Sequence, residues 1–212
     1  MKLYSYFRSS AAYRLRIALQ MKGLEVDYVP IDLLKTEQKS DAYLAMNPQG
    51  LVPAMELPGG ITLGQSVALL EWLEETHPEP ALLPADSLER ARVRSVVNNI
   101  TCDVHPICNL AVTNYLKEHL GAEQSDIIDW YTHWMHRGFI AVEEVLAGND
   151  STYSFGEQPG LADICLVPQV YNARRFDIAL DAFPHINRVV DNCNALAPFR
   201  DAAPERQPDS TL

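Results

Sequence analysis

The sequence has no long apolar run and no cluster of basic residues, and each of these absences excludes a class of protein. No apolar segment in the 212 residues approaches the length that crosses a bilayer, so no membrane partner is expected. Seventeen basic residues against 28 acidic ones give a formal net charge of −11. Without a basic patch, nucleic acid is not an expected partner either. An anionic ligand would therefore need individual arginines at its site.

Cysteine is also scarce in this chain. Its four cysteines include no CxxC pair and are too few for a disulfide framework in a protein of this length. The first residues, MKLYSYF, alternate like a strand and lack the apolar stretch of a signal peptide. The sequence therefore predicts reduced thiols and a cytoplasmic location.

Apolar periodicity and turn residues divide the chain into two domains and a linker. Short strands and helices alternate over residues 1–80 in the order β-α-β, then α, then β-β-α. The three prolines of HPEPALLPADS (77–87) indicate a linker, which we place at residues 81–86. Residues 87–212 have helical patterns, so the second predicted domain is all-helical.

Four helices are expected in the second domain. The expected helices span about residues 86–119, 122–147, 160–176 and 184 onward, and residues 203–212 are expected to be irregular. Asp86 and Glu89 form a capping-box pattern at the start of the first of them. Pro106 and Pro168 lie inside expected helices and should bend them.

Arg8, Ser9 and Ser10 stand where the first strand passes into the first helix, and two interpretations are open. In one, a serine hydroxyl simply caps the helix. In the other, the junction binds an anion, because a helix N-terminus presents unpaired N–H groups and a partial positive charge. The helix dipole and a hydroxyl would lower the pKa of a thiol bound there, and with no cysteine in this stretch that thiol must come from outside the chain. Arg14 and Arg16, further along the helix, are expected to be structural.

Two later segments of the first domain also point to a ligand. Val52-Pro53 stands at a strand entry, where a cis bond would turn the backbone N–H and C=O of Val52 outward, able to pair with a peptide-like ligand. Gln65 and Ser66 stand at the next helix start, with Ser66 as the expected cap and the helix end as a second anion site. Three ligand-facing features thus occur in one thioredoxin-like order of elements.

A resemblance to a known family rests on several segments spread along the chain. They are YSYFRSSAAYRLRIALQMKG, NPQGLVPAMEL, QSVALLEWLEE, ALLPAD, HPICNLAV, LADICLVPQVYNARRF and RQPD. On these segments the chain resembles the zeta class of glutathione transferases over nearly its whole length. The resemblance implies an α/β thioredoxin-like N-terminal domain, an all-α C-terminal helical bundle, glutathione as cofactor and a homodimer.

The resemblance also implies which residues bind glutathione. They are Ser9, Ser10, Gln38, Val52, Pro53, Gln65, Ser66, His105 and Asn109. Ser9 would donate its hydroxyl to the glutathione sulfur, and the backbone of Val52 would pair with the cysteinyl unit. Gln65 and Ser66 would hold the γ-glutamyl carboxylate.

The implied reaction is cis–trans isomerisation of maleylacetoacetate to fumarylacetoacetate, in tyrosine and phenylalanine catabolism. It would proceed by thiolate addition, rotation about the resulting single bond and elimination. Ser9, Ser10 and Arg8 would be the catalytic residues. Arg8 and Arg175 would bind the carboxylates of the small-molecule diacid, because arginine pairs with carboxylates in a bidentate manner.

Three other functions remain open at this point. Maleylpyruvate, from gentisate degradation, needs the same chemistry on a shorter chain, and a general glutathione transferase or a non-catalytic glutathione-fold binding protein is also conceivable. A maleylpyruvate enzyme would be expected to place extra cations near its substrate. The apolar Leu110-Ala111 that follows Asn109 therefore favours maleylacetoacetate. The intact set of ligand-facing segments argues against a protein that has lost its activity.

Two positions depart from the pattern of the class. Ala11 stands where a cysteine is usual, which puts in doubt only side reactions of that cysteine, because glutathione supplies the nucleophile. Gly160 stands three residues before Asp163, where Ser or Thr is usual. The hydroxyl half of a capping box is therefore missing, and a modest loss of stability is expected.

The remaining polar candidates have simpler interpretations. Cys102, His105 and Asn109 fall on one stripe of the expected helix, but they are too few to hold zinc, and no metal is expected. Arg174 and Arg175 are adjacent, so they point different ways on a helix. One of them is expected to be solvated or salt-bridged.

Overall fold

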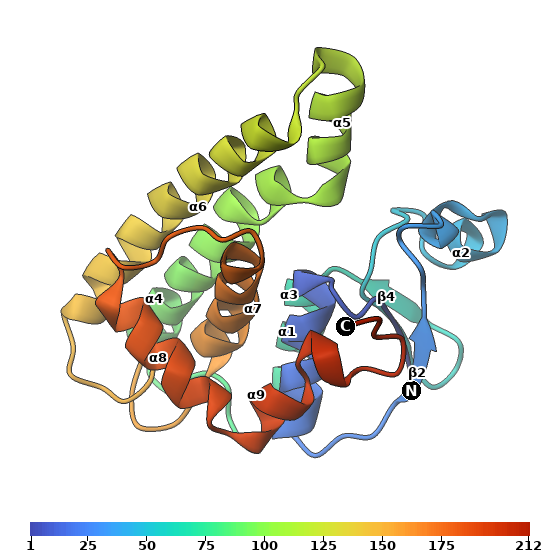
Figure 1. The fold of residues 1–212 in the computed structure, drawn as a ribbon. Coiled ribbons are helices and arrows are strands. Elements are labelled where there is room, and N and C mark those ends of the chain that lie inside the picture. The colour runs from blue at the N-terminus through green and yellow to red at the C-terminus, as the bar shows by residue number, and fades with distance from the viewer. The chain divides into compact units, whose positions relative to one another are not determined.

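The computed structural model describes residues 1–212 and divides into two compact units. Residues 1–82 and 194–212 form the first unit, and residues 83–193 form the second (Figure 1). The break after residue 82 lies within the expected linker. The C-terminal segment differs from expectation, because it belongs to the first unit and not to the helical one.

Long-range hydrogen bonds attach this C-terminal segment to the first unit. The Arg16 Nε donates to the carbonyl oxygen of Ala202 at 2.9 Å. The backbone N–H of Phe7 and the hydroxyl of Tyr28 donate to the two carboxylate oxygens of Asp209, at 3.0 and 2.7 Å. These partners lie far apart in sequence, so no local pattern could have revealed them.

A four-stranded mixed sheet organises the first unit. The strands are β1 (Lys2–Ser5), β2 (Asp27–Pro30), β3 (Ala54–Glu56) and β4 (Thr62–Gly64). They lie in the order β2-β1-β3-β4, with β1 parallel to β2 and antiparallel to β3, and with β3 antiparallel to β4. The helices of this unit are α1 (Ser10–Met21), α2 (Asp41–Met46), α3 (Ser66–Thr76) and α9 (Ala197–Asp201). Of these, α9 was not predicted.

Helices α1 and α3 lie side by side and supply much of the apolar core of the first unit (Figure 1). The fully buried side chains of this unit include Leu3, Leu15, Ile17, Met55, Leu69, Leu70 and Leu73. They come from both helices and from β1 and β3. A separate cluster of buried residues contains Tyr6, Phe7, Tyr43, Val52 and Ala54. One of the predicted ligand-binding segments is therefore built directly onto a core cluster.

The second unit is all-helical, as expected. Its helices are α4 (Ser87–Asn98), α5 (Leu110–Leu120), α6 (Gln124–Ala147), α7 (Leu161–Arg175) and α8 (Pro184–Asn194). The Asp86 carboxylate caps α4 by accepting from the N–H groups of Leu88 and Glu89 at 2.9 and 3.0 Å. Gly121 has a positive φ of 69° and ends α5, a conformation that glycine adopts without strain.

The single long helix expected over residues 86–119 is wrong. Helix α4 passes into a π-helical turn (Asn99–Val104) and then a 3₁₀ turn (Pro106–Cys108) before α5 begins. Pro106 has no N–H to continue the helical ladder. Asn109 then accepts from the N–H of Val112 at 3.0 Å and so caps a new helix.

Gly138 on α6 permits a close approach to the π-helical turn. A Cβ atom at this position would overlap Val104 Cγ2 and would lie 3.2 Å from Asn99 Oδ1. Only a residue without a side chain fits between them. The backbone of α6 at Gly138 therefore packs directly against the side chains of the turn.

Helix α7 begins without a hydroxyl cap, as the sequence predicted. Gly160 is its N-cap residue, and the buried Asp163 carboxylate accepts from the N–H groups of Gly160 and Ser154 at 2.8 and 2.9 Å. Burial raises the pKa of Asp163. Pro168 lies inside this helix, as expected.

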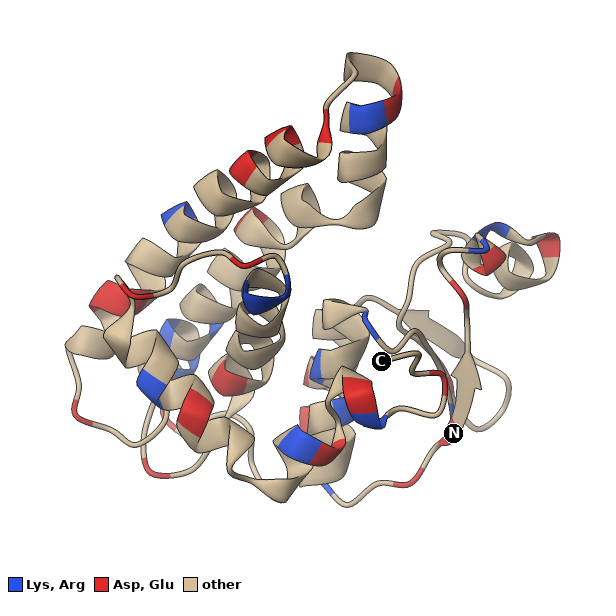
Figure 2. Ribbon diagram, in the orientation of Figure 1, with Lys and Arg blue, Asp and Glu red and all other residues tan.

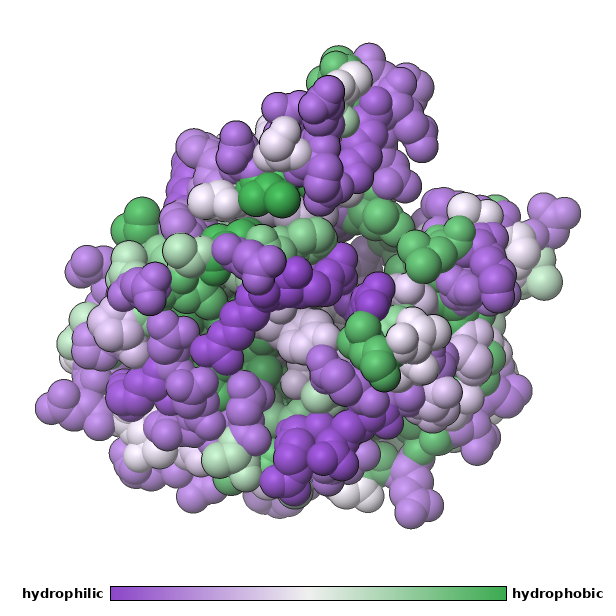
Figure 3. Space-filling view, viewed as in Figure 1, coloured by the Kyte–Doolittle hydropathy of each residue, from purple (hydrophilic) through white to green (hydrophobic).

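The helices and the surface show the same lack of long apolar segments and of basic clusters as the sequence. None of the helices combines the length and the apolar character that a membrane span requires. Figure 2 shows Lys and Arg residues distributed over elements of both units, among the acidic ones. On the face drawn in Figure 3, hydrophilic residues predominate and apolar side chains form separate patches.

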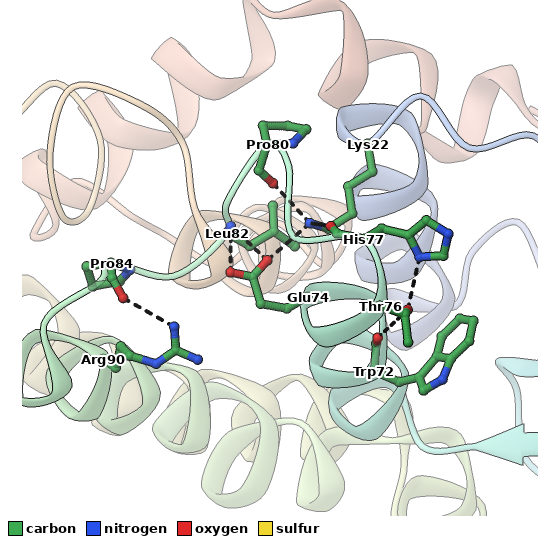
Figure 4. A network of polar contacts seen from close by, with 9 residues as sticks. All are labelled: Lys22, Trp72, Glu74, Thr76, His77, Pro80, Leu82, Pro84 and Arg90. Atoms are coloured by element: carbon green, nitrogen blue, oxygen red, sulfur yellow. Dashed lines mark hydrogen bonds and ion pairs between the residues drawn. The ribbon is translucent and has the colours of Figure 1, made fainter.

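A buried ion pair anchors the end of the first unit (Figure 4). The Lys22 Nζ lies 3.1 Å from Glu74 Oε2, with side-chain exposures of 0% and 8%. The same ammonium donates to the carbonyl oxygens of His77 and Pro80 at 2.6 and 2.9 Å. The Glu74 carboxylate accepts from the Leu82 N–H at 3.0 Å. One buried pair thus holds residues 77–82, the segment that leads out of the first unit toward α4.

Replacing one member of this pair should destabilise the protein strongly. Glu74→Gln leaves the Lys22 ammonium buried without its counter-charge, and we expect a loss of about 3–5 kcal/mol in the free energy of unfolding. Glu75→Gln, at the next and exposed position of α3, should change it by less than about 0.5 kcal/mol. Urea denaturation followed by circular dichroism measures both. Equal effects would contradict the structural role of the pair.

The contact at Gly138 gives a second test. Gly138→Ala forces a methyl group into Val104, and we expect a loss of about 1–3 kcal/mol in the free energy of unfolding. Gly148→Ala is the control, because Gly148 ends the same helix at a φ of −75° that alanine adopts readily. The control should leave stability unchanged or raise it by about 0.4–1 kcal/mol. An unaffected Gly138→Ala variant would refute the close contact.

Candidate functional site

The first candidate group is the hydroxyl of Ser9, which caps α1. The backbone of Ser9 is extended, with φ −69° and ψ 116°, and its Oγ accepts from the N–H of Ala12 at 3.2 Å. The capping interpretation is therefore confirmed. A hydroxyl also has a hydrogen to donate, and the cap uses only its acceptor side. The same group can thus cap the helix and donate to an anion at the positive end of the helix dipole.

The arginines around this turn divide into structural and candidate ligand-binding groups. Arg16 is buried and donates to the carbonyl oxygens of Phe7 and Ala202, so its structural role is confirmed. Arg8 is half-buried, and its guanidinium carbon lies 5.0 Å from the centroid of the Phe7 ring. The Arg8 Nε is buried and has no hydrogen-bond partner within the chain. Arg8 is therefore the cation of this turn that retains a donor for a ligand.

Val52 offers a second candidate group through its backbone. The Val52-Pro53 peptide bond is cis, and Val52 is 8% exposed. Neither its N–H nor its C=O is hydrogen-bonded to another group of the chain. Most buried backbone groups are paired, so an unpaired donor and acceptor on one residue can accommodate an extended peptide-like ligand.

The start of α3 differs from the expected capping arrangement. Gln65 is the N-cap residue and Ser66 is the first residue of the helix, so the prediction of Ser66 as the cap is wrong. Gln65 has a φ of 66°, which is strained for a residue with a side chain, and such strain clusters at functional sites. Its amide donates to Gln49 Oε1 at 2.9 Å and makes no capping bond.

A buried cation lies at the start of the same helix. Arg14 is 1% exposed, and its Nη1 donates to Ser66 Oγ at 3.3 Å. Arg14 was expected to be structural. Its contact with Ser66, a predicted ligand-binding residue, shows that it also lies next to the candidate site. Neither this contact nor the one made by Gln49 has a local sequence pattern that would have predicted it.

Gln38 lies in a 3₁₀ turn (Glu37–Lys39) that approaches the loop before Val52. A Cβ atom on Gly50 would lie 2.9 Å from the Gln38 carbonyl oxygen, so the two backbones are in close contact. The side-chain Oε1 of Gln38 is buried without a hydrogen-bond partner. An unsatisfied acceptor at this place fits a donor group on a ligand.

The second unit holds the other predicted ligand-binding residues. His105 lies between the π-helical and 3₁₀ turns, and its N–H donates to the Ile100 carbonyl at 2.9 Å. Asn109 is the N-cap residue of α5. Because the chain changes from one helix type to another here, the expected stripe of Cys102, His105 and Asn109 on a single helix is wrong.

The two adjacent arginines of α7 have different environments, as expected. Arg174 lies 3.3 Å from Asp191 Oδ1 in a half-exposed ion pair. The guanidinium carbon of Arg175 lies 4.4 Å from the centroid of the Phe176 ring, which in turn lies 4.6 Å from the ring of Tyr131. Of the two, Arg175 is the one that stacks against an aromatic ring.

None of the four cysteines lies in the first unit, and two of the buried thiols are unsuited to nucleophilic chemistry at neutral pH. All four cysteines are free, and Cys108, Cys165 and Cys193 are buried. Burial raises the pKa of Cys108 to about 12 and also raises the pKa of Cys193. A thiolate at the α1 N-terminus would therefore have to be supplied by a ligand.

Comparisons with known proteins match both parts of the chain to family models. Residues 3–81 match the family model for the glutathione S-transferase N-terminal domain, and residues 107–197 match the model for the C-terminal domain. The chain is 47% identical over 212 residues to a maleylacetoacetate isomerase from Pseudomonas aeruginosa, covering 99% of both sequences.

Solved structures resemble the chain over its full length. A holo structure of maleyl pyruvate isomerase, described as a bacterial zeta-class glutathione S-transferase, has a TM-score of 0.97 at 47% identity and covers 100% of both chains. A maleylacetoacetate isomerase from Anaeromyxobacter dehalogenans, solved with bound glutathione, has a TM-score of 0.89 at 45% identity. It covers 99% of this chain and 97% of its own.

The two roles of the Ser9 hydroxyl can be separated by substitution. Ser9→Ala removes the cap and should lower the free energy of unfolding by about 0.5–2 kcal/mol. Ser9→Asp keeps a strong capping acceptor and should be as stable as the wild-type protein. Thermal unfolding followed by circular dichroism compares the three proteins. A Ser9→Asp variant as unstable as Ser9→Ala would show that Ser9 Oγ does not stabilise the helix as a cap.

Proposed function

Because the chain belongs to the glutathione S-transferase family, and within it to the zeta class, we propose that it is a glutathione-dependent cis–trans isomerase acting on maleylacetoacetate. The observation that carries the proposal is the Ser9 hydroxyl, fixed by its cap at the N-terminus of α1 with its hydrogen still to donate. The product is fumarylacetoacetate, and the reaction belongs to tyrosine and phenylalanine breakdown.

The residues of the first unit fit glutathione. Its thiol takes the place at Ser9 and Ser10, where hydroxyl hydrogens and the helix dipole favour an anion. The unpaired N–H and C=O of Val52 take the peptide part of the ligand, and Gln65 and Ser66 at the start of α3 take a carboxylate. The buried, unpaired Oε1 of Gln38 supports a further contact to the tripeptide.

The predicted residues of the second unit remain part of the proposal. We propose that His105 and Asn109 contact glutathione and that Arg175 contacts the substrate. In the structure, His105 and Asn109 lie on either side of a 3₁₀ turn, and Arg175 lies near the end of α7.

Bound glutathione supplies a thiolate that adds to the double bond and leaves again, so that the bond is single while it rotates. Ser9 keeps the sulfur ionised by donating its hydroxyl hydrogen, and the α1 dipole adds to this stabilisation. Arg8 and Arg175 hold the two carboxylates of the diacid in place, since guanidinium groups pair with carboxylates in a bidentate manner. Arg8 also offers its cationic charge to the negative charge that develops on the substrate.

Maleylpyruvate is the second candidate substrate. A maleyl pyruvate isomerase is among the solved structures most similar to this chain, and the overall similarity to the two kinds of enzyme is nearly equal. Leu110 favours maleylacetoacetate, because this 44%-exposed apolar residue follows Asn109, where a maleylpyruvate enzyme would be expected to place an extra cation.

We also infer a homodimer in the cytoplasm. Large apolar side chains are exposed in both units, and such side chains are commonly covered by a partner. The exposed large apolar residues include Leu51, Ile61, Leu88, Leu110, Tyr115, Leu120 and Ile140. Four free cysteines suit a reducing compartment.

A direct assay tests the proposed activity. The purified protein is mixed with maleylacetoacetate or maleylpyruvate, with and without glutathione, and the loss of enol absorbance is followed. We expect rapid turnover of maleylacetoacetate that requires glutathione. Turnover without glutathione, or none with either acid, would refute the proposal, and a preference for maleylpyruvate would assign the second substrate instead.

Ser9→Asp is the matched variant for this assay. It keeps the cap but has no hydrogen to donate and places a negative charge beside the sulfur. We expect kcat to fall at least about 100-fold, as when other donors to a reacting anion are removed. A variant with normal turnover would mean that another group ionises the sulfur.

A further inference from the structure

The carbonyl oxygen of Leu51 receives two buried side-chain donors. The Tyr43 hydroxyl donates to it at 2.7 Å, and the Asn47 Nδ2 donates to it at 2.8 Å. Tyr43 is 4% exposed and Asn47 is 6% exposed. Tyr43 lies within α2 and Asn47 is the C-cap residue of that helix, and both converge on the residue immediately before Val52.

The bonded carbonyl and the Val52 N–H belong to the same peptide group. The Leu51–Val52 bond is trans, since the cis bonds of the chain are Val52-Pro53 and Glu79-Pro80. In a planar trans peptide the C=O and the N–H point in opposite directions. Two donors that hold the Leu51 oxygen toward the protein therefore direct the Val52 N–H away from Tyr43 and Asn47. Bonds accepted by the oxygen also polarise the group and strengthen the N–H as a donor.

The Asn47 side chain contacts a second predicted ligand-binding segment. A Cβ atom on Gly64 would lie 3.4 Å from Asn47 Oδ1, so the amide packs against the residue that precedes Gln65. The backbone of Asn47 also accepts from the N–H of Gly50 at 2.9 Å, closing the turn that leads to Leu51. One side chain thus lies between the segment that ends in Val52 and the segment that begins at Gln65.

We propose that Tyr43 and Asn47 are positioning residues for glutathione, which aim and strengthen the Val52 N–H by holding the Leu51 carbonyl. This inference rests on the proposed function, because it takes glutathione to be the ligand of Val52. Neither side chain contacts the ligand. Burial raises the pKa of Tyr43, so its hydroxyl stays protonated and remains a donor at neutral pH.

Tyr43→Phe tests the proposal, because it removes one hydroxyl and keeps the ring. We expect the dissociation constant for glutathione, measured by calorimetry, to rise about threefold or more, with kcat at saturating glutathione unchanged. Asn47→Asp keeps the shape of the side chain but replaces the donor with an acceptor, and it should weaken binding further.

Tyr13→Phe is the matched control. The Tyr13 hydroxyl also donates to a backbone carbonyl, that of Phe199 at 3.1 Å, and the side chain is 2% exposed. Its loss should lower stability about as much as the loss of the Tyr43 hydroxyl while leaving glutathione affinity unchanged. Equal loss of affinity in both variants would mean that Tyr43 acts only through stability, and would overturn the proposal.

A modified ligand isolates the Val52 bond. In a glutathione analogue with a trans-alkene in place of the cysteinyl–glycine amide, no carbonyl is present at that link to accept from Val52. With this analogue, the wild-type protein and Tyr43→Phe should have the same dissociation constant, so that the ratio of their affinities falls to one. An undiminished ratio, or a Tyr43→Phe variant that binds glutathione as well as the wild-type protein, refutes the positioning role.

The outcomes separate this inference from the proposed function. A wild-type protein that binds glutathione but isomerises neither acid refutes the function, while the affinity ratios still decide the role of Tyr43. Normal isomerase activity with unaltered affinity in Tyr43→Phe refutes the positioning role alone. A wild-type protein that does not bind glutathione refutes both.

Discussion

The candidate site depends on a backbone turn that is held by two side chains outside it, one from α1 and one from the other end of the chain. Arg16 donates to the carbonyl of Phe7 at 3.0 Å, and Asp209 accepts from the N–H of the same residue. With the turn fixed, the bond from the Ala12 N–H to Ser9 Oγ sets the position of the hydroxyl. A donor that is already in place needs no reorganisation when an anion arrives, which is the main source of its effect on a reacting group.

Local patterns predicted the elements that present the ligand-binding groups. Alternation and caps located the strands of the first unit and helices α1, α3 and α6, because these elements are amphipathic and bounded by glycine, proline or a capping side chain. The sequence also marked Val52-Pro53 as the place where a cis bond would turn the Val52 backbone outward, and this bond is cis in the structure. At each of these places the local backbone conformation is determined by residues that are close together in the sequence.

The features that the sequence did not predict depend on distant partners or on competition between neighbours. A single helix was expected to continue through Pro106, but Asn109 provides the cap of a new helix. Apolar periodicity alone cannot decide between a continuous helix and two helices with a new cap between them. The C-terminal segment joins the first unit through Asp209, whose partners Phe7 and Tyr28 lie at the other end of the chain. Gln65, not Ser66, is the N-cap residue of α3, and its side-chain amide bonds to Gln49 outside the helix instead of capping it.

The first unit meets an anionic ligand mainly with partial charges. Its buried cations are engaged within the fold: Arg16 with backbone carbonyls, Lys22 with Glu74, and Arg14 with Ser66 at the α3 N-terminus. The groups that we propose face the ligand are helix ends, hydroxyls and the peptide N–H of Val52. A net charge of −11 opposes an anion only weakly at a distance, because the Debye length is about 8 Å at physiological ionic strength. Within that distance oriented dipoles dominate, which is why we propose that the groups that orient them, such as Tyr43 and Asn47, influence affinity without touching the ligand.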